Sequence, residues 1–358
     1  METARWLNPA WWVADQPEAP GETLPVGMEL PGWVWFRTSG STGEPKWVGL
    51  TREALMLSAA VVNRHLAVSP GDVWGLALPV RHVGGFGVVA RAYESASKLA
   101  VFSGKWDPRK FVGWLEAERV GHCPLVPAQV HDLVVAGLRA PAALRSVVVG
   151  GGRFAPESAR AARALGWPVL ASYGMTEAAS QIATEGLEIL DMPYSDKPLP
   201  VLPHWRVDTD ADGRIRIAGP ALFSGVLRRE GDGWRVEARE GDAFLTSDRG
   251  VIEGGGLRVL GRVDRVVKIL GELVDLDAVE AACGTENIVL DLPDLRRGRE
   301  LVLVGSGDGL EQRVQAYNQG VAGPWRIARW LRVESIPRTP LGKPDRMALR
   351  GWICGREI

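Results

Sequence analysis

Segments typical of β-strands alternate with segments typical of α-helices between residues 51 and 174, and this alternation constrains the fold most strongly. A helix is expected from Thr51, a plausible N-cap. It is followed by apolar strand-like runs at 73–80, 98–104, 122–127, 144–152 and 168–174, with helix-like segments at 108–119, 127–137 and 156–166. This order predicts a mainly parallel sheet covered by helices. Ligands of such sheets bind beyond the carboxyl ends of the strands, where residues 150–152 and 172–177 are expected to lie.

The pattern changes after residue 200. Residues 201–260 alternate polar and apolar side chains around DG and GD turns, which is typical of antiparallel hairpins. A smaller α/β segment follows to the C-terminus. We therefore predict an α/β protein with two domains, residues 1–263 and 264–358, the first containing helix-covered mixed sheets and a hairpin-rich subdomain at about 200–262.

Composition excludes several classes of function. The 42 basic and 43 acidic side chains give a net charge of -1, so nothing favours a nucleic-acid partner. The three cysteines form no CxxC pair that would suggest a metal knuckle. No apolar run reaches the roughly 20 residues of a membrane span. The first residues also lack the apolar stretch of a signal peptide, so we expect a cytoplasmic protein without membrane insertion.

The stretch TSGSTGEPK (38–46) combines glycines, hydroxyl side chains and Lys46. It is not a P-loop, because its two glycines are too close together and Lys46 is followed by Trp47. Backbone N–H groups of a glycine-rich turn can nevertheless converge on an anion, and the hydroxyls and the lysine add donors and charge. The alternative is an ordinary surface turn.

A second stretch, SYGMTEAASQ (172–181), places Thr176 and Glu177 at an expected strand-to-helix turn. A carboxylate beside a hydroxyl can hold Mg²⁺ and a phosphate oxygen, although Thr176 could equally be a helix cap. Three further stretches, LTSDRG (245–250), GRVDRVVKILG (261–271) and PRTPLGKPDR (337–346), are each compatible with a solvated turn.

Taken together in this order, the five stretches resemble the signatures of the adenylate-forming superfamily, over about residues 36–346. Within it, LPVRHVGGFGVVAR (78–91) and SYGMTEAASQIAT (172–184) are most similar to the o-succinylbenzoate–CoA ligases of menaquinone biosynthesis. The resemblance implies an adenylate-forming fold with a small, mobile C-terminal domain. It also implies conversion of 2-succinylbenzoate, ATP and CoA into 2-succinylbenzoyl-CoA, AMP and diphosphate.

The resemblance assigns ATP contacts to several groups. Thr176 would meet the α-phosphate, Glu177 would bind Mg²⁺ as the metal ligand, and Asp248 would take the ribose hydroxyls with help from Arg262. The remaining residues expected around ATP are Thr38, Ser39, Gly40, Ser41, Thr42, Gly43 and Lys46 at the phosphates, and Gly150, Gly151, Gly152, Tyr173 and Gly174 near the adenine.

The resemblance also implies a catalytic lysine and a hinge. Lys343 would bridge the attacking carboxylate and the α-phosphate, where a cation offsets the repulsion of two anions. Asp264 would be the hinge about which the small domain rotates, presenting Lys268 and Gly271 to CoA.

For the acid pocket, we expect Arg91 to bind a distal carboxylate, with Arg81 as the second choice. Its other expected members are His82, Gly84, Gly85, Phe86 and Ser172, and His82 is also counted with Thr176 and Glu177 among the catalytic groups.

Two alternatives to this function stay open. One is a related ligase that loads another acid onto CoA or a carrier protein. The other is a nucleotide-binding relative without catalysis, against which the joint presence of Lys46, Glu177, Asp248 and Lys343 argues. Fewer than forty residues precede the phosphate stretch, so a sheet of longer relatives is expected to be missing or supplied by a partner in a homodimer.

Overall fold

The computed structural model describes residues 2–25, 30–39, 45–231, 233–270, 272–284, 286–294, 298–321, 323–339 and 342–354. The chain forms two compact units. The first contains residues 1–210, 215–246 and 251–258, and the second contains residues 211–214, 247–250 and 259–358. The predicted domain boundary at Asp264 falls in the 3-10 turn η3 (Val263–Arg265) of the second unit.

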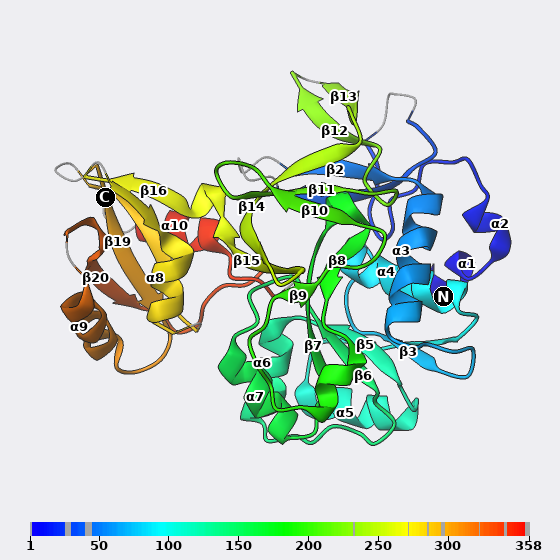
Figure 1. Cartoon of the computed structure of the whole chain (residues 1–358), viewed down its shortest axis with the longest axis horizontal. Helices are drawn as coiled ribbons and strands as arrows, with labels where there is room; N and C mark the ends of the chain where they lie inside the picture. Colours follow the sequence, from blue (N-terminus) through cyan, green and yellow to red (C-terminus); the bar gives the residue numbers. More distant parts are fainter. Residues whose placement is uncertain are drawn as a thin grey trace. The chain divides into compact units, whose positions relative to one another are not determined.

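A six-stranded sheet forms the centre of the first unit (Figure 1). Its strand order is β4-β3-β5-β6-β7-β8, and the first five strands run parallel as predicted. The last strand, β8, runs antiparallel to β7. The bounds are β3 (Val73–Leu76), β4 (Lys98–Val101), β5 (His122–Leu125), β6 (Ser146–Val149), β7 (Val169–Met175) and β8 (Ser180–Thr184).

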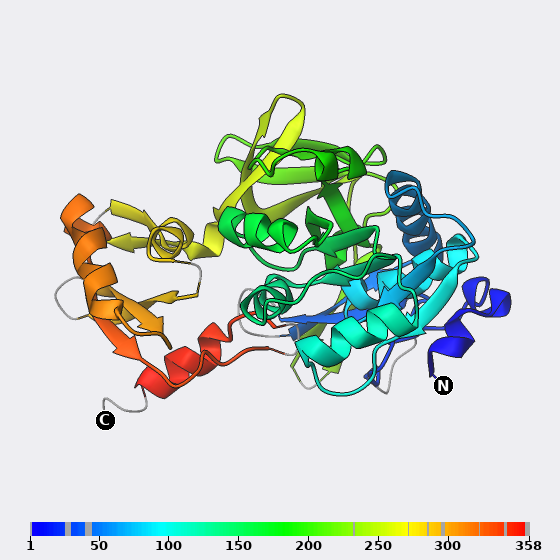
Figure 2. The same cartoon turned by 90° about the horizontal axis from the view of Figure 1, so that it is seen from below.

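Helices cover both faces of this sheet (Figure 2). Val148 of β6 joins the core under α3 (Arg52–His65) and α4 (Val83–Glu94), while its neighbours Val147 and Val149 join the core under α5 (Pro108–Ala117), α6 (Pro127–Val135) and α7 (Pro156–Ala164). This is the two-residue period of a strand buried on both faces. The helix from Thr51 was predicted correctly, and the Thr51 hydroxyl accepts a hydrogen bond from the Ala54 N–H at 3.1 Å.

Two antiparallel sheets complete the strands of residues 34–262. One has the order β1-β2-β12-β13, and the other has the order β10-β11-β14-β15-β9, so the hairpins expected after residue 200 are present. The hairpin β12–β13 pairs with β2, which is far away in sequence. The bounds are β1 (Val34–Ser39), β2 (Pro45–Leu50), β9 (Leu199–Pro200), β10 (Arg206–Thr209), β11 (Arg214–Ala218), β12 (Gly225–Glu230), β13 (Gly233–Ala238), β14 (Ala243–Glu253) and β15 (Gly256–Arg262).

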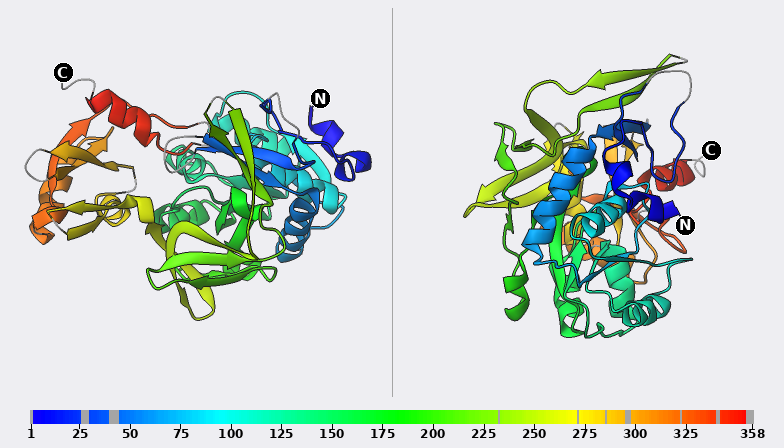
Figure 3. Two further views of the ribbon diagram at one scale, coloured as in Figure 1. Left: turned by 90° about the horizontal axis from the view of Figure 1, so that it is seen from above. Right: turned by 90° about the vertical axis from the view of Figure 1, so that its right-hand side faces the viewer.

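Two short helices at the N-terminus, α1 (Glu2–Trp6) and α2 (Pro9–Trp12), pack beside α4 (Figure 3). Trp6 is fully buried and meets Phe86 edge-to-face at 5.3 Å between ring centroids. The Trp12 indole donates to the Trp6 carbonyl at 2.8 Å. Both tryptophans therefore belong to the core.

The second unit is an α/β structure built on the sheet β18-β19-β20. Val289, Leu301 and Leu303 face α8 (Leu276–Ala282) and α9 (Leu310–Gly320), while Ile288, Leu290 and Val302 face α10 (Arg346–Cys354) (Figure 2). The strands are β16 (Val266–Ile269), β17 (Glu272–Asp275), β18 (Ile288–Asp294), β19 (Gly298–Gly305) and β20 (Ile327–Arg332). Among all the described residues, no helix has the length and apolar character needed to cross a membrane.

Candidate active site

The carboxyl end of β6 lies beside β7, as the predicted parallel sheet requires. A Cβ atom at Gly150, the residue after β6, would lie 3.4 Å from the Ser172 carbonyl oxygen of β7. A Cβ atom at Gly174 would lie 1.8 Å from the Ser180 carbonyl oxygen, so only glycine fits against β8 there. The predicted strand-to-helix turn is wrong: β7 is followed by the single 3-10 turn η1 (Thr176–Ala178) and then by the strand β8. This turn keeps Thr176 and Glu177 at the sheet edge without a following helix.

An ion pair joins the first two sequence motifs. Nζ of Lys46, on β2, lies 2.7 Å from Oε1 of Glu177, on η1, although the two residues are 131 positions apart. The Lys46 side chain is 20% exposed and that of Glu177 is 14% exposed, so both remain within reach of a ligand while being only weakly screened. Glu177 is held further by its carbonyl oxygen, which accepts from the Phe223 N–H at 2.9 Å.

The rest of the phosphate motif is described only in part. The Thr38 hydroxyl donates to the Lys46 carbonyl at 3.4 Å across the hairpin β1–β2, and Ser39 ends β1. The predicted contacts at Gly40, Ser41, Thr42 and Gly43 lie outside the described residues.

The Arg91 side chain, on α4, is a buried cation. Residue Arg91 is only 2% exposed, and its Nη2 donates to the Ser180 hydroxyl at 3.2 Å while the guanidinium lies 5.3 Å from the centroid of the Trp74 ring. Burial lowers the pKa of Arg91 to about 10. Among the described residues, no carboxylate forms an ion pair with it. Keeping a guanidinium charged at this depth, without a carboxylate partner among the described residues, is energetically costly.

The contact that Arg91 makes depends on an unusual backbone conformation. Ala179 has φ of 48° and Ser180 has φ of 108°, both in the region that favours glycine. The buried Ser58 hydroxyl donates to the Ala179 carbonyl at 3.0 Å and holds this segment. Sequence reasoning did not assign a role to Ser180, because neither spacing nor composition signals a strained backbone.

The other residues of the expected acid pocket lie at the start of α4. His82 is half-buried at the N-cap position, and a Cβ atom at Gly84 would meet nothing closer than Leu78 at 3.8 Å. Phe86 is fully buried among Trp6 and other aromatic rings, so its side chain lies in the core. The Ser172 hydroxyl is within 2.8 Å of the Thr184 hydroxyl on β8. Tyr173 lies on β7 and packs partly buried against the same core, and Gly151 and Gly152 follow Gly150 in the turn after β6.

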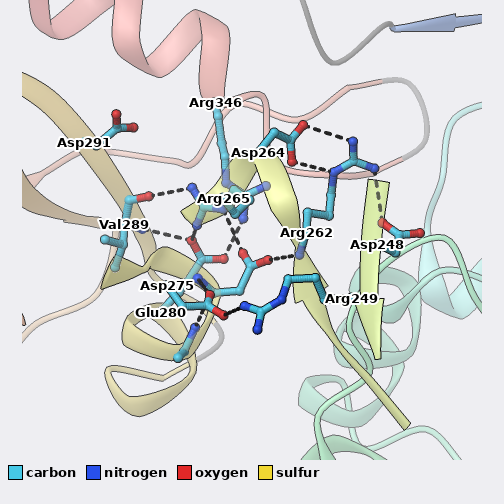
Figure 4. Close-up of polar contacts among 12 residues, drawn as sticks. Asp248, Arg249, Arg262, Asp264, Arg265, Asp275, Glu280, Val289, Asp291 and Arg346 are labelled. Carbon is cyan, nitrogen blue, oxygen red and sulfur yellow. Dashed lines mark hydrogen bonds and ion pairs between the residues drawn. The ribbon is translucent and has the colours of Figure 1, made fainter. Parts of the chain in front are cut away.

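The second unit contains the remaining candidate residues, of which Asp248, Arg262 and Asp264 are drawn in Figure 4. Arg262 forms two hydrogen bonds to Asp264, at 2.8 and 3.0 Å, and its Nη1 lies 3.3 Å from Oδ1 of Asp248. The predicted ribose ligand, its assisting arginine and the predicted hinge residue are thus one cluster. Lys268 is exposed on β16, and Lys343 is exposed in the loop before α10. Gly271 lies outside the described residues.

Comparison with known proteins identifies the family of the chain. The model of the AMP-binding enzyme family matches residues 34–227. A relative from Mycobacterium tuberculosis, named a probable 2-succinylbenzoate–CoA ligase, is 32% identical over 342 residues, which cover 87% of this chain and 82% of that protein. The chain therefore belongs to the AMP-binding enzyme family.

Solved structures show the same fold. The o-succinylbenzoate CoA synthetase MenE of Bacillus subtilis, in complex with the acyl-adenylate OSB-AMP, is 23% identical with a TM-score of 0.74, over 88% of this chain and 68% of that one. ATP-bound MatB of Rhodopseudomonas palustris is 23% identical with a TM-score of 0.74, over 89% of this chain and 67% of that one. The predicted adenylate-forming fold is confirmed.

Proposed function

We propose that this chain is an AMP-forming acid–CoA ligase, and that its acid is 2-succinylbenzoate, as used in menaquinone biosynthesis. The observation that supports the reaction most directly is the ion pair between Lys46 and Glu177 at the edge of the six-stranded sheet. It puts a cation for phosphate beside a carboxylate for Mg²⁺, from two motifs far apart in sequence. The name of the Mycobacterium tuberculosis relative supports the choice of acid.

The chain's own groups fit a magnesium-bound nucleotide. The Glu177 carboxylate is partly exposed, and its backbone carbonyl is held by the Phe223 N–H, so the carboxylate can exchange Lys46 for a metal ion without movement of η1. Mg²⁺ prefers one or two carboxylates together with substrate phosphates, and it offsets their negative charge. We assign the phosphates to Lys46, Thr38 and the segment that follows it, the metal to Glu177, and the ribose hydroxyls to Asp248.

The reaction has two halves. In the first, a carboxylate oxygen of the acid attacks the α-phosphorus of ATP, and the bond to diphosphate breaks. In the second, the sulfur of CoA loses its proton and attacks the acyl carbon, and the bond from that carbon to the oxygen of AMP breaks as AMP leaves. We assign to Lys343 the cation that brings the two anions together in the first half, and to Thr176 a contact with the α-phosphate. Asp264 is our candidate for the hinge, and Lys268 for a contact with CoA.

The acid is expected to bind through its second carboxylate. Arg91 has the properties required of that partner: a buried guanidinium, no carboxylate counterion among the described residues, and a hydroxyl, that of Ser180, to orient one nitrogen. A planar guanidinium can bind a carboxylate with two parallel hydrogen bonds. The polar atoms of His82 and Ser172 and the open space at Gly84 are assigned to the same pocket. We also propose a homodimer in the cytoplasm, where ATP and CoA are available.

The test is formation of AMP and acyl-CoA from Mg-ATP, CoA and 2-succinylbenzoate, beside a panel of benzoates and fatty acids. We expect 2-succinylbenzoate to have a kcat/KM at least tenfold above the other acids. We expect Lys343→Ala to lower kcat of the first half-reaction by roughly 100- to 1,000-fold, the usual effect of removing one preorganised electrostatic contact. The control is Lys98→Ala, on an exposed lysine of the first unit.

Each outcome separates the candidates. Preference for another acid would keep the ligase reaction and reject 2-succinylbenzoate as the substrate. Absence of AMP with every acid would reject the ligase and favour a nucleotide-binding protein without catalysis. Undiminished turnover by the Lys343→Ala variant would reject the role of that lysine.

A further inference from the structure

We propose that Glu280 is a positioning residue that fastens the loop of Lys343 to the turn η3, so that the two segments keep one fixed geometry. The inference rests on the proposed function only in treating Lys343 as the cation of the first half-reaction. All the residues involved belong to the second unit. In the sequence, residues 261–271, which contain η3, and residues 337–346, the lysine loop, are separate motifs, and no link between them was predicted.

The first half of the link is Arg265, the last residue of η3 (Figure 4). Its Nη2 lies 2.8 Å from Oε2 of Glu280, its Nε lies 2.8 Å from Oδ1 of Asp277, and its Nη1 donates to the Val289 carbonyl at 3.0 Å. The Arg265 side chain is only 11% exposed. Three nitrogens of the guanidinium are thus bound, and the turn is fastened to α8 and β18.

The second half is Arg346, the first residue of α10. Its Nη2 lies 2.6 Å from Oε1 of Glu280. Because Oε2 of Glu280 receives Arg265 and also the Val289 N–H at 3.0 Å, both oxygens of this carboxylate are occupied. The Glu280 side chain is 16% exposed, so water and salt screen these interactions less than those of a surface ion pair.

Arg346 lies three residues after Lys343, and the loop between them has few ways to move independently. The Thr339 N–H donates to the Lys343 carbonyl at 2.8 Å, and the Asp345 N–H donates to the Pro337 carbonyl at 2.7 Å. The Asp345 carboxylate then accepts from the Ala348 N–H at 2.9 Å, at the start of α10. Displacing the lysine loop relative to η3 would therefore break the bond between Glu280 and Arg346.

This arrangement is useful to a lysine that must be placed accurately. A displacement of about 1 Å at a reacting centre can cost a factor of 100 in rate. Lys343 is itself exposed on a flexible side chain, so its accuracy depends on the backbone that carries it. Glu280 supplies that accuracy through two arginines, without touching a substrate itself.

The experiment compares Glu280→Gln, which keeps the size of the side chain and removes its charge, with Glu286→Gln. Glu286 is a matched control in the same unit, half exposed and paired with Arg313 at 3.1 Å. The first half-reaction is followed as diphosphate released without CoA. We expect Glu280→Gln to lower its kcat at least tenfold while KM for ATP changes less than twofold, and Glu286→Gln to change neither.

A double-mutant cycle distinguishes positioning from general damage to the unit. In a Lys343→Ala background there is no ammonium to position, so Glu280→Gln should reduce the residual rate less than twofold. A similar reduction in both backgrounds, or no reduction in the parent background, would overturn the proposal.

A second measurement does not require activity. Amide hydrogen exchange over residues 337–346 should become at least tenfold faster in Glu280→Gln than in the parent, because the loop loses its link to α8. Unchanged exchange would overturn the inference even if the ligase assignment held. A parent protein that forms no AMP, but shows the faster exchange in the variant, would reject the proposed function and keep the link between the two segments.

Discussion

Replacing Arg91 with methionine should weaken binding of a dicarboxylate while leaving the fold nearly as stable as before. Truncating a fully buried side chain of this size usually lowers stability by several kcal/mol. Arg91 is different because its charge is buried without a carboxylate counterion among the described residues. The fall of its pKa from 12.5 to about 10 corresponds to a penalty of roughly 3 kcal/mol on the charged form.

Methionine fills much of the same volume and removes that penalty. What is lost is the hydrogen bond to Ser180 and the contact with the Trp74 ring, together about 1–3 kcal/mol. The two effects are of similar size, so the free energy of unfolding at pH 7 is expected to change by no more than about 1 kcal/mol. Acid binding has no such compensation, because removing one partner of a desolvated charge pair costs roughly 2–5 kcal/mol. KM for 2-succinylbenzoate should therefore rise at least about 30-fold.

The assay measures KM for the acid and for ATP, with thermal unfolding of the same samples. The control Arg160→Met removes an exposed arginine of α7 that pairs with Glu157, and should change neither KM. Benzoate, which has no second carboxylate, should be affected by Arg91→Met much less than 2-succinylbenzoate. A stability loss of several kcal/mol with an unchanged KM for the acid would show that Arg91 is a structural residue.

Two further predictions concern other parts of the first unit. A Cβ atom at Gly85 would lie 2.3 Å from the Pro79 carbonyl oxygen, whereas the nearest atom to a Cβ at Gly84 lies 3.8 Å away. Gly85→Ala should therefore lower the free energy of unfolding by about 2 kcal/mol or more, while Gly84→Ala should leave stability unchanged and raise KM for the acid. Identical behaviour of the two variants would contradict this prediction. Burial, with a smaller contribution from Arg145, lowers the pKa of His122 despite the opposing charge of Asp72. Below about pH 6.5 the unfolded chain therefore binds a proton at this histidine that the folded chain does not, so the free energy of unfolding should fall as the pH drops. Denaturant unfolding measures the fall in the free energy of unfolding between pH 7 and pH 5. This fall should be smaller in His122→Gln than in the parent, and unchanged in the control His131→Gln, which replaces an exposed residue. An equal fall in all three proteins would contradict the assignment.

The sequence could predict the central sheet because its signals are local. The strands of the parallel sheet are short apolar runs, and the helices beside them carry recognisable start signals, such as the N-cap hydroxyl of Thr51 or Pro108 in the first turn. The meeting of Lys46 with Glu177 could also be anticipated, since the family resemblance places both at the phosphates. The sheet needed only the periodicity of its elements, whereas the meeting of Lys46 with Glu177 needed the family resemblance.

Other features depend on contacts that no local pattern encodes. The helix α4 was not predicted because VGGFGVV contains three glycines, and its stability comes from burial rather than from helix propensity. The pairing of β12 with β2 joins segments about 180 residues apart, which alternation alone cannot specify. The 3-10 turn at Thr176 was taken for a helix start because a hydroxyl followed by a carboxylate is typical of both.

The candidate residues also differ in how their charges are balanced, and this difference indicates how ligands are selected. Lys46 is paired with Glu177, and Arg262 with Asp248 and Asp264, so a magnesium-bound nucleotide would replace one set of ionic partners by another. These groups therefore have ionic partners both with and without the nucleotide, so the nucleotide can be released as readily as it is bound. Arg91 has no carboxylate to give up among the described residues, so in the proposed pocket an acid with a second carboxylate would gain the whole interaction. An acid without that group would leave the buried guanidinium as it was. The uncompensated cation is therefore the feature that would make this ligase prefer a dicarboxylate to a simple benzoate.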